Sequence, residues 1–348
     1  MIGLPALSRN SYSRGNLIVK PVLGITLGEA AGIGPELIAK LCANDRLTQY
    51  CQPVLIGDVR VLEAGQKTAK VSFPFQVVDN IDKVVWEGPI TIVDLKNLDP
   101  ATVEVATVNA ASGRVTEETL LFGLELLKQK KIDGLVFAPL NKEAMKRGGM
   151  KFEDEHRLFA HQLDWNKPFG EINVLDKLWT TRVTSHIPLS EVASKLTTDN
   201  ILRAVALAHQ TLNRAGYEKP RIAVAAINPH AGEGGLCGRE EIDVIGPAVK
   251  TACSQGLDVV GPFSADTVFI NAFAGHYDAV VTMYHDQGQI AMKLMGFQFG
   301  VTVAGGLPYA ITTPAHGTAF DIAGKGVAKT DATEKAVMIA AKMAGWRG

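Results

Sequence analysis

Short runs of apolar, often β-branched residues alternate along the chain with longer segments in which apolar positions recur at helical spacing. This alternation is typical of βαβ units, so it predicts an α/β fold with a mainly parallel sheet. The predicted strands lie at residues 21–26, 54–56, 90–93, 134–138, 179–184, 221–227, 257–260 and 278–283.

Two segments carry clear helix signals. Residues 115–130 hold glutamates near the start and lysines near the end, which is the charge order that stabilises a helix dipole. The last helix is predicted to begin at Asp331, because Glu334 follows three residues later in a capping-box pattern. Its run to Met343 is rich in alanine, which favours close packing on one face.

Composition places the chain among ordinary globular proteins. Its 348 residues are 47% apolar and 20% charged with a net charge of -1, and the length allows two domains. We expect no nucleic-acid partner, because no basic cluster is present, and no membrane span, because no apolar stretch is long enough. Residues 1–20 lack a continuous apolar core and are expected to form a flexible extension rather than a signal peptide. The four cysteines form no paired motif, which favours free thiols and a cytoplasmic location.

Three histidines each stand just past a predicted strand. His186, His230 and His285 follow the apolar runs 179–185, 221–227 and 278–284. Ligands in open α/β sheets bind beyond the carboxyl ends of the strands, so three imidazoles there predict a catalytic divalent-metal site. A single histidine in such a place is more often a surface or capping residue. Three together, two of them in loops rich in glycine and aspartate, favour the site.

Charged residues accompany these histidines. Asp266 follows another strand and Asp286 follows His285 directly, and we expect both to orient imidazoles or to transfer protons, with helix N-capping as the alternative. Lys293 lies eight residues after His285, slightly over two helical turns, so both should face the same side of a helix. In its apolar surroundings Lys293 is predicted to contact a substrate anion or hydroxyl, the alternative being a lysine that extends into solvent.

Two glycine-containing segments lie near the ends of the chain. Residues 24–36 predict a strand, a glycine loop and a helix with proline in its first turn, a weak anion-binding signal that a tight structural turn explains equally well. Their spacing is not that of the dinucleotide fingerprint G-x-G-x-x-G. Residues 316–326 contain His316 and Asp321, and an aspartate there favours a dinucleotide ribose, with an ordinary surface loop as the alternative.

Together these motifs resemble the 4-hydroxythreonine-4-phosphate dehydrogenase family of pyridoxal-phosphate biosynthesis. The resemblance runs from about Leu23 to the C-terminus. It is carried by residues 28–36, 185–189, 228–235, 265–267 and 283–288. Residues 32–36 and 316–326 are also similar to segments of the isopropylmalate and isocitrate dehydrogenases.

The resemblance implies a two-domain α/β/α sandwich similar to the isocitrate and isopropylmalate dehydrogenases. Residues 21–135 and 300–348 would form an outer α/β domain with the cofactor loop. Residues 136–299 would form a central α/β domain with the metal site and the dimer interface. The active site would lie in the interdomain cleft, at the interface of a homodimer.

The resemblance also implies roles for individual residues. His186, His230 and His285 match divalent-metal ligands that are shared between the two subunits, and Lys293 matches a substrate-binding lysine. The predicted catalytic residues are Lys293, Asp266 and Asp286. The predicted cofactor contacts are Gly306, Leu307, Pro308, His316 and Asp321, where the aspartate favours NAD over NADP. The metal is expected to be zinc or another divalent ion such as magnesium, manganese or cobalt.

Three positions depart from the family pattern. Thr302 stands where the family has a substrate-contacting asparagine, and Ile311 stands where it has a phosphate-contacting arginine. A Gly-His-Thr-Glu substrate motif is replaced by residues 154–157, in which His156 and Arg157 are the predicted substrate contacts. Losing the arginine removes a bidentate anion partner and leaves an apolar wall. The pattern therefore favours an unphosphorylated substrate with an apolar ring and a second carboxylate, as in terephthalate cis-dihydrodiol dehydrogenase.

We therefore predict a metal-dependent, NAD-linked dehydrogenase that oxidises the 3-hydroxyl of a hydroxy acid with decarboxylation, acting on a cis-dihydrodiol carboxylate such as terephthalate dihydrodiol. The alternatives within the family are 4-hydroxythreonine 4-phosphate and threonate or erythronate 4-phosphate as substrates. A zinc hydrolase also fits three histidines, but it has no use for the predicted nucleotide loop at residues 316–326. A non-catalytic NAD-binding regulator fits that loop, and the three histidines with Lys293 disfavour it.

Overall fold

The computed structural model describes residues 20–347, and one mixed sheet runs through this part of the chain. Its strands are β1 (Val22–Thr26), β2 (Gln52–Gly57), β3 (Phe75–Val78), β4 (Ile90–Asp94), β5 (Gly134–Phe137), β6 (Gly170–Leu175), β7 (Leu178–Arg182), β8 (Ile222–Ala225), β9 (Val259–Phe263), β10 (Ala279–Thr282), β11 (Val301–Gly305) and β12 (Ala310–Pro314). The α-helices are α1 (Gly34–Ala43), α2 (Val59–Ala69), α3 (Ala110–Lys128), α4 (Lys142–Arg147), α5 (Glu155–Gln162), α6 (Val192–Lys195), α7 (Thr198–Arg214), α8 (Gly246–Ser254), α9 (Ala265–Phe273), α10 (His285–Gly296) and α11 (Asp331–Met343).

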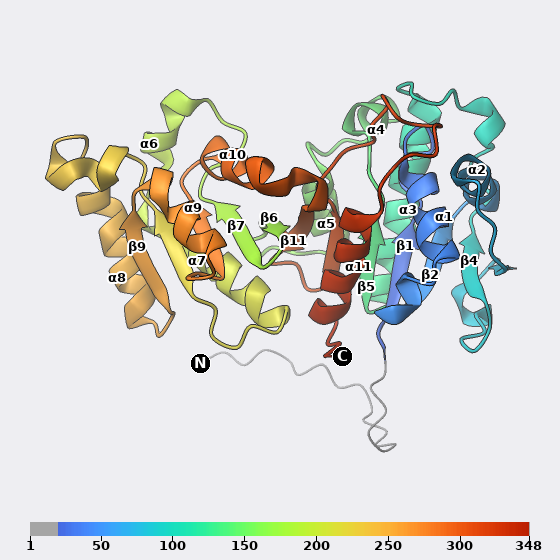
Figure 1. Ribbon diagram of the computed structural model, residues 1–348, viewed down its shortest axis with the longest axis horizontal. Coiled ribbons are helices and arrows are strands. Elements are labelled where there is room, and N and C mark those ends of the chain that lie inside the picture. Colours follow the sequence, from blue (N-terminus) through green and yellow to red (C-terminus); the bar gives the residue numbers. More distant parts are fainter. Residues whose placement is uncertain (1–19, 348) are drawn as a thin grey trace, which may run out of the picture.

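Two parallel blocks meet in an antiparallel centre. The first block is β3-β4-β2-β1-β5-β12 and the second block is β7-β10-β8-β9, each with parallel neighbours. Between them, β11 is antiparallel to both β12 and β6, and β6 is antiparallel to β7. Figure 1 shows the blocks side by side along the long axis, with α1 and α2 near one end and α8 near the other. Because β12 pairs with β5, the C-terminal part of the chain joins the first block.

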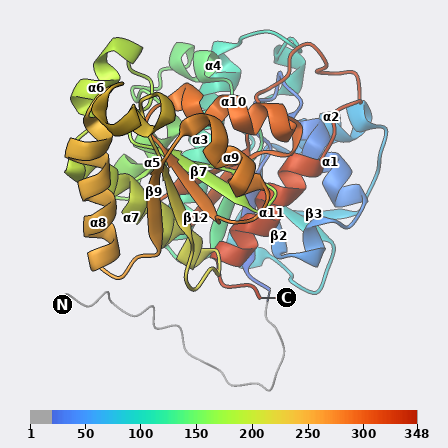
Figure 2. The ribbon, with the colours of Figure 1, turned by 60° about the vertical axis from the view of Figure 1, so that its left-hand side comes forward.

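Helices cover both faces of the second block. On one face, Val205 of α7 packs in a hydrophobic cluster with Val224 of β8. On the other face, Val268 of α9 and Met292 of α10 pack in a cluster with Ala223 of β8. Figure 2 shows the strands of this block between α7 and α8 on one side and α9 on the other. Strands buried on both faces have nearly continuous apolar sequences, which is why the run at 221–227 is recognisable.

Every predicted strand overlaps an observed strand, so the α/β fold class is confirmed. The apolar pattern does not predict β3, β6, β11 and β12. The pattern does not reveal β6 because Glu171 and Asn173 alternate with its apolar residues. It does not reveal β12 because this strand carries two threonines and ends at Pro314. The division into an outer and a central domain stays a prediction, and its boundary after residue 135 falls inside β5.

One helix prediction needs correction at its start and the other in its capping. The helix expected at 115–130 is α3, which begins five residues earlier because the Asn109 side chain accepts a hydrogen bond from the Ser112 amide. The last helix begins at Asp331 as predicted, but the capping box is absent. The Glu334 carboxylate instead accepts hydrogen bonds from Arg46 (3.0 Å) and Tyr50 (2.9 Å), which tie α11 to the segment after α1.

Within residues 20–347, no helix is long and apolar enough to cross a membrane. All four cysteines are free, as predicted, with Cys42 and Cys51 buried. The predicted extension at residues 1–20 lies, apart from Lys20, outside the described residues.

Candidate active site

Two of the predicted metal ligands lie together. His186 follows β7 and His285 begins α10 after β10, and β7 and β10 are parallel neighbours whose carboxyl ends meet. Their ring centres are 5.4 Å apart. An imidazole centre lies about 3.2 Å from a zinc ion that it binds, so two ligands at a tetrahedral angle have centres roughly 5.2 Å apart. The pair therefore fits a single divalent ion.

Asp286 contacts one of these imidazoles. Its Oδ1 lies 2.7 Å from Nδ1 of His285, which fixes the ring and leaves Nε2 as the nitrogen that could bind a metal. Asp286 lies in the first turn of α10, so the orienting role that its sequence position predicts has a matching contact. Asp266 lies in the first turn of α9 with an exposed side chain. It comes two residues after Ser264, which occupies the N-cap position, so Asp266 is not the N-cap.

His230 does not join the other two histidines. Within residues 20–347, no group of three or more histidine, cysteine, aspartate or glutamate side chains is close enough to hold a metal ion. His230 is exposed in a turn after β8, and its backbone has a φ of 51°. One chain thus brings together two of the three predicted ligands, and convergence of all three within a single chain is not observed.

One face of α10 carries a row of polar residues. His285, Gln289 and Lys293 are spaced four residues apart in this helix, so they lie above one another, as predicted for His285 and Lys293. Lys293 is exposed, and Gln289 donates a hydrogen bond of 2.6 Å to Oδ1 of Asn173. The helix is therefore anchored midway between its two predicted functional residues.

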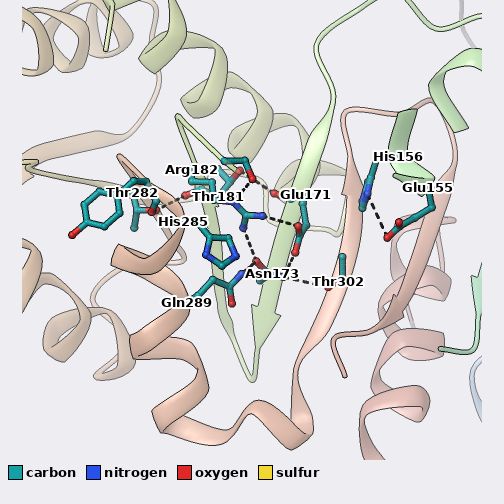
Figure 3. Close-up of polar contacts among 12 residues, drawn as sticks. Glu155, His156, Glu171, Asn173, Thr181, Arg182, Thr282, His285, Gln289 and Thr302 are labelled. Atoms are coloured by element: carbon teal, nitrogen blue, oxygen red, sulfur yellow. Dashed lines mark hydrogen bonds and ion pairs between the residues drawn. The ribbon is translucent and has the colours of Figure 1, made fainter. Parts of the chain in front are cut away.

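Gln289 belongs to a polar cluster that connects α10 to the sheet (Figure 3). We define the polar cluster as Glu171, Asn173, Arg182, Gln289 and Thr302. Arg182 donates to Glu171 (2.6 Å) and to Asn173 Oδ1 (3.1 Å), and Asn173 Nδ2 donates to Glu171 (2.8 Å) and to Thr302 (3.2 Å). Arg182 also donates to Ser185, next to His186 (3.0 Å). The cluster therefore joins β6, β7 and β11 to both histidines.

The cluster holds a charged pair. Removal of Glu171 from water would raise the pKa of its carboxyl, but the Arg182 charge, the Asn173 hydrogen bond and the His156 charge outweigh this and lower the pKa to about 2. The Arg182 side chain is only 7% exposed. Sequence reasoning missed these residues, although polar residues alternating with apolar ones at 171–174 are the signal of a strand with one polar face.

The predicted substrate residues divide into two groups. Thr302 belongs to the polar cluster, and His156 is 9% exposed and close enough to influence the pKa of Glu171. Arg157 is exposed and pairs with Glu153 at 2.8 Å. Ile311 is 0% exposed within a hydrophobic cluster, so it forms no wall open to a substrate. The structure thus brings Thr302 and His156 to the candidate site and leaves Arg157 and Ile311 outside it.

The predicted cofactor residues are also separated. Gly306, Leu307 and Pro308 form the turn between β11 and β12, whereas His316 follows the other end of β12. A five-residue strand is about 17 Å long, so the two groups lie at opposite ends of β12 and far apart. His316 is half-buried, which lowers the pKa of its imidazole, and Asp321 is exposed.

The segment after His316 packs on α1. The Ile33 amide donates to the Thr318 carbonyl (3.2 Å), and Lys40 donates to the carbonyls of Gly326 (3.0 Å) and Ala328 (2.7 Å). At Gly32, a side chain would come within 2.8 Å of Thr318. The glycine motif at 24–36 therefore supports the segment 316–328, and this use of the Ile33 amide favours the structural alternative over an anion site.

Comparisons with known proteins agree with these motifs. The family model described as pyridoxal phosphate biosynthetic protein PdxA matches residues 49–340. A relative from Rhizobium meliloti (strain 1021), whose name places it among the 4-hydroxythreonine-4-phosphate dehydrogenases, is 46% identical over 327 residues, 93% of this chain and 94% of its own length. D-threonate 4-phosphate dehydrogenase from Cupriavidus necator is 40% identical over 326 residues, 93% of this chain and 97% of that protein.

Solved structures give the same result. A crystal structure of 4-hydroxythreonine-4-phosphate dehydrogenase from Klebsiella pneumoniae has a TM-score of 0.81 and 34% identity, covering 93% of this chain and 99% of that one. Terephthalate 1,2-cis-dihydrodiol dehydrogenase from Burkholderia xenovorans LB400 is more distant, with a TM-score of 0.62 and 27% identity over 89% of this chain and 94% of that one. Because the family model and these relatives span most of the chain, this protein belongs to the family of pyridoxal phosphate biosynthetic protein PdxA.

Proposed function

We propose that this protein is a metal-dependent dehydrogenase that oxidises a hydroxyl of a 4-phosphorylated hydroxy acid, with NAD as the hydride acceptor. The observation that carries the proposal is the His186–His285 pair beside the polar cluster. Relatives that cover most of the chain have names that specify 4-hydroxythreonine 4-phosphate or D-threonate 4-phosphate. These two compounds are the proposed substrates.

The earlier expectation of a dihydrodiol substrate is replaced for two reasons. The dihydrodiol dehydrogenase is the more distant structural relative, at 27% identity. The argument from Ile311 also fails, because its side chain is buried in the core rather than lining a pocket. A zinc hydrolase has no support among the relatives, whose names specify dehydrogenases.

In this proposal the chain's own residues orient the reacting groups. A divalent ion held by His186 and His285 would polarise the substrate hydroxyl, and NAD would take the hydride. Asp286 keeps the His285 ring in place through its 2.7 Å contact. Lys293, two turns along the same face of α10, donates a hydrogen bond to the substrate oxygen that gains negative charge.

The reaction removes a hydride from the carbinol carbon and a proton from its hydroxyl. A 3-keto acid results, and its loss of carbon dioxide leaves an enolate that the Lys293 ammonium stabilises before a proton returns to carbon. The segment 316–328, fixed on α1, would hold the adenosine half of NAD, with Asp321 accepting from the ribose hydroxyls. Asp266 remains the second predicted proton-transfer residue.

We further propose that the active unit is a homodimer in which His230 of a second copy completes the metal site. Large apolar side chains that are close in sequence to the candidate ligands are exposed, which supports a surface that is covered in an assembly. They are Leu189 (69% exposed), Leu236 (85%), Ile290 (60%) and Leu294 (82%). They lie near His186, His230 and His285 in sequence, so a covering copy would reach the site itself.

Mixing inactive variants tests this arrangement. His186→Ala and His230→Ala homodimers should both be inactive, but a mixed dimer contains one intact site, with His186 and His285 from one chain and His230 from the other. Random re-association makes half of the dimers mixed, so about one quarter of the wild-type activity should return. Mixing His186→Ala with His285→Ala is the matched control and should restore nothing. Equal recovery in both mixtures, or in neither, contradicts the shared site.

A substrate comparison tests the proposed reaction. NADH formation should be followed with zinc, manganese or magnesium and three substrates, namely 4-hydroxythreonine 4-phosphate, D-threonate 4-phosphate and terephthalate dihydrodiol. We expect turnover only with a phosphorylated compound and none after chelation of the metal. Preference for the dihydrodiol would overturn the substrate assignment.

A further inference from the structure

The turn that carries His230 has an unusual backbone. Six successive residues, 230–235, have positive φ values of 51°, 54°, 81°, 46°, 67° and 102°. Three of them, His230, Ala231 and Glu233, are not glycine, and a left-handed conformation is unfavourable for an L-residue. Such a turn persists only where the surrounding structure enforces it.

Glu241 provides that enforcement. Its side chain is buried, with 5% exposure, and one carboxylate oxygen accepts the backbone N–H groups of Ile227 (2.9 Å) and Asn228 (2.8 Å). The other oxygen accepts Nδ2 of Asn228 at 2.9 Å. Only Pro229 separates these donors from the left-handed residues, so the carboxylate fixes the direction in which the chain enters the turn.

Two glycines let the turn close around this carboxylate. A Cβ at Gly232 would lie 2.7 Å from the second oxygen of Glu241, and a Cβ at Gly238 would lie 2.4 Å from Nδ2 of Asn228. Both glycines have positive φ values, 81° and 114°. The turn and the carboxylate therefore fit together as one unit.

The helix that presents Glu241 is irregular as well. Residues Glu241–Ile245 form a π-helical turn that leads into α8. Single π turns are rare and place a residue where a regular helix would not. Glu241 is the first residue of this turn.

We infer that Glu241 is a positioning residue, which holds His230 in the projecting orientation needed to complete the metal site of a second copy. The inference rests on the proposed shared site and adds a residue to it. His230 is exposed and does not meet His186 and His285 within its own chain, so the turn presents it outward. Without the Glu241 hydrogen bonds, the left-handed residues lose their support and the imidazole loses its fixed place.

The metal affinity of purified dimers tests the inference without an activity assay. We expect Glu241→Gln to weaken zinc binding about 10- to 100-fold in competition with a chromophoric chelator, since the side-chain amide keeps one oxygen for the backbone N–H groups of residues 227 and 228 but turns its NH2 group toward the Asn228 Nδ2 donor. Asp243→Asn is the matched control, because Asp243 lies in the same π turn but forms an exposed pair with Arg239. Equal zinc affinity in the two variants would overturn the inference.

Mixed dimers separate positioning from a general structural role. Glu241→Gln should recover activity when mixed with His186→Ala, whose chain supplies an intact His230 turn, and should not recover with His230→Ala. A variant that only destabilises the fold should give the same activity in both mixtures, whichever chain it is paired with. If Glu241→Gln gives no folded dimer, Glu241→Asp takes its place, and loss of folding in both contradicts a positioning role. Failure of the His186→Ala with His230→Ala mixture would instead contradict the shared site itself.

Discussion

A buried and a half-buried glutamate show how differently the first block and the antiparallel centre of the sheet stabilise a carboxylate. Glu29 follows β1 in the first block, is 0% exposed, and has a pKa raised by burial despite hydrogen bonds from Ser112 and Ala31. Glu171 lies in β6 beside the second block, and its pKa is lowered to about 2 although burial opposes ionisation there too. The difference lies in the partner, because Glu171 has the Arg182 guanidinium at 2.6 Å and Glu29 has only neutral donors.

The comparison indicates which part of the sheet supports the proposed chemistry. In the first block burial raises the pKa of the Glu29 carboxyl, and one of its oxygens has no hydrogen-bond partner among the described residues. Glu171 keeps its charge next to the residues proposed to bind a cation and an anionic substrate. A paired arginine and carboxylate there provide fixed charges without a large net field. We therefore regard Glu171 as part of the active-site support and Glu29 as part of the packing of the glycine motif.

The largest effect should follow from breaking the Glu171–Arg182 pair. Glu171→Gln leaves the Arg182 guanidinium, 7% exposed, without its counter-charge, and removing one partner of a buried pair costs about 3 to 5 kcal/mol. We expect a loss of unfolding free energy near the lower end of this range, because Glu171 itself is 28% exposed. Urea unfolding at fixed protein concentration measures the change in unfolding free energy. The exposed Asp79–Lys83 pair supplies the control variant Asp79→Asn, and equal stability of both variants would contradict the assignment.

A smaller effect should follow from cutting the link between the cluster and α10. Gln289→Ala removes the 2.6 Å hydrogen bond to Asn173, which is worth about 1 kcal/mol of unfolding free energy. Because Gln289 stands between His285 and Lys293, we also expect zinc affinity to fall by up to about tenfold. Gln129→Ala is the control, since Gln129 forms a comparable but exposed hydrogen bond with Glu125 on α3. Unchanged zinc affinity in Gln289→Ala would separate the cluster from the metal site.

The part of this site that depends on single strand ends can be predicted from the sequence, whereas the part that is assembled from distant segments cannot. His186 and His285 are predictable because each follows a clear apolar strand, and parallel neighbours place their carboxyl ends together. The polar cluster is not predictable in the same way, since its members come from β6, β7, β11 and α10 and β6 has no continuous apolar run. The role of Glu241 depends on six successive positive φ values, which the residue pattern does not predict.

The cofactor residues show the cost of missing a strand. A prediction that misses β11 and β12 places Gly306 and His316 in one loop. In the structure β12 lies between them, so they are at opposite ends of that strand. The prediction of an unphosphorylated substrate was wrong for a related reason. It assumed that Ile311, in place of the family's arginine, lines the substrate pocket. In this chain the side chain at that position packs in the core, so its identity does not describe the pocket.

The smallest effect, and the one that tests the comparison most directly, is the pH dependence of stability. A carboxyl with a raised pKa, such as Glu29, contributes stability that is fully present below its unfolded pKa near 4.5 and is lost as the pH rises through its folded pKa. Glu171 has the opposite sign, since its contribution is present above 4.5 and is lost as the pH falls toward about 2. Glu29→Gln, whose amide does not titrate, should therefore gain stability relative to the unmodified protein as the pH rises from 4.5 to 8. Urea unfolding across that range measures the difference, and a constant difference would mean that Glu29 is ionised in the folded protein, as Glu171 is.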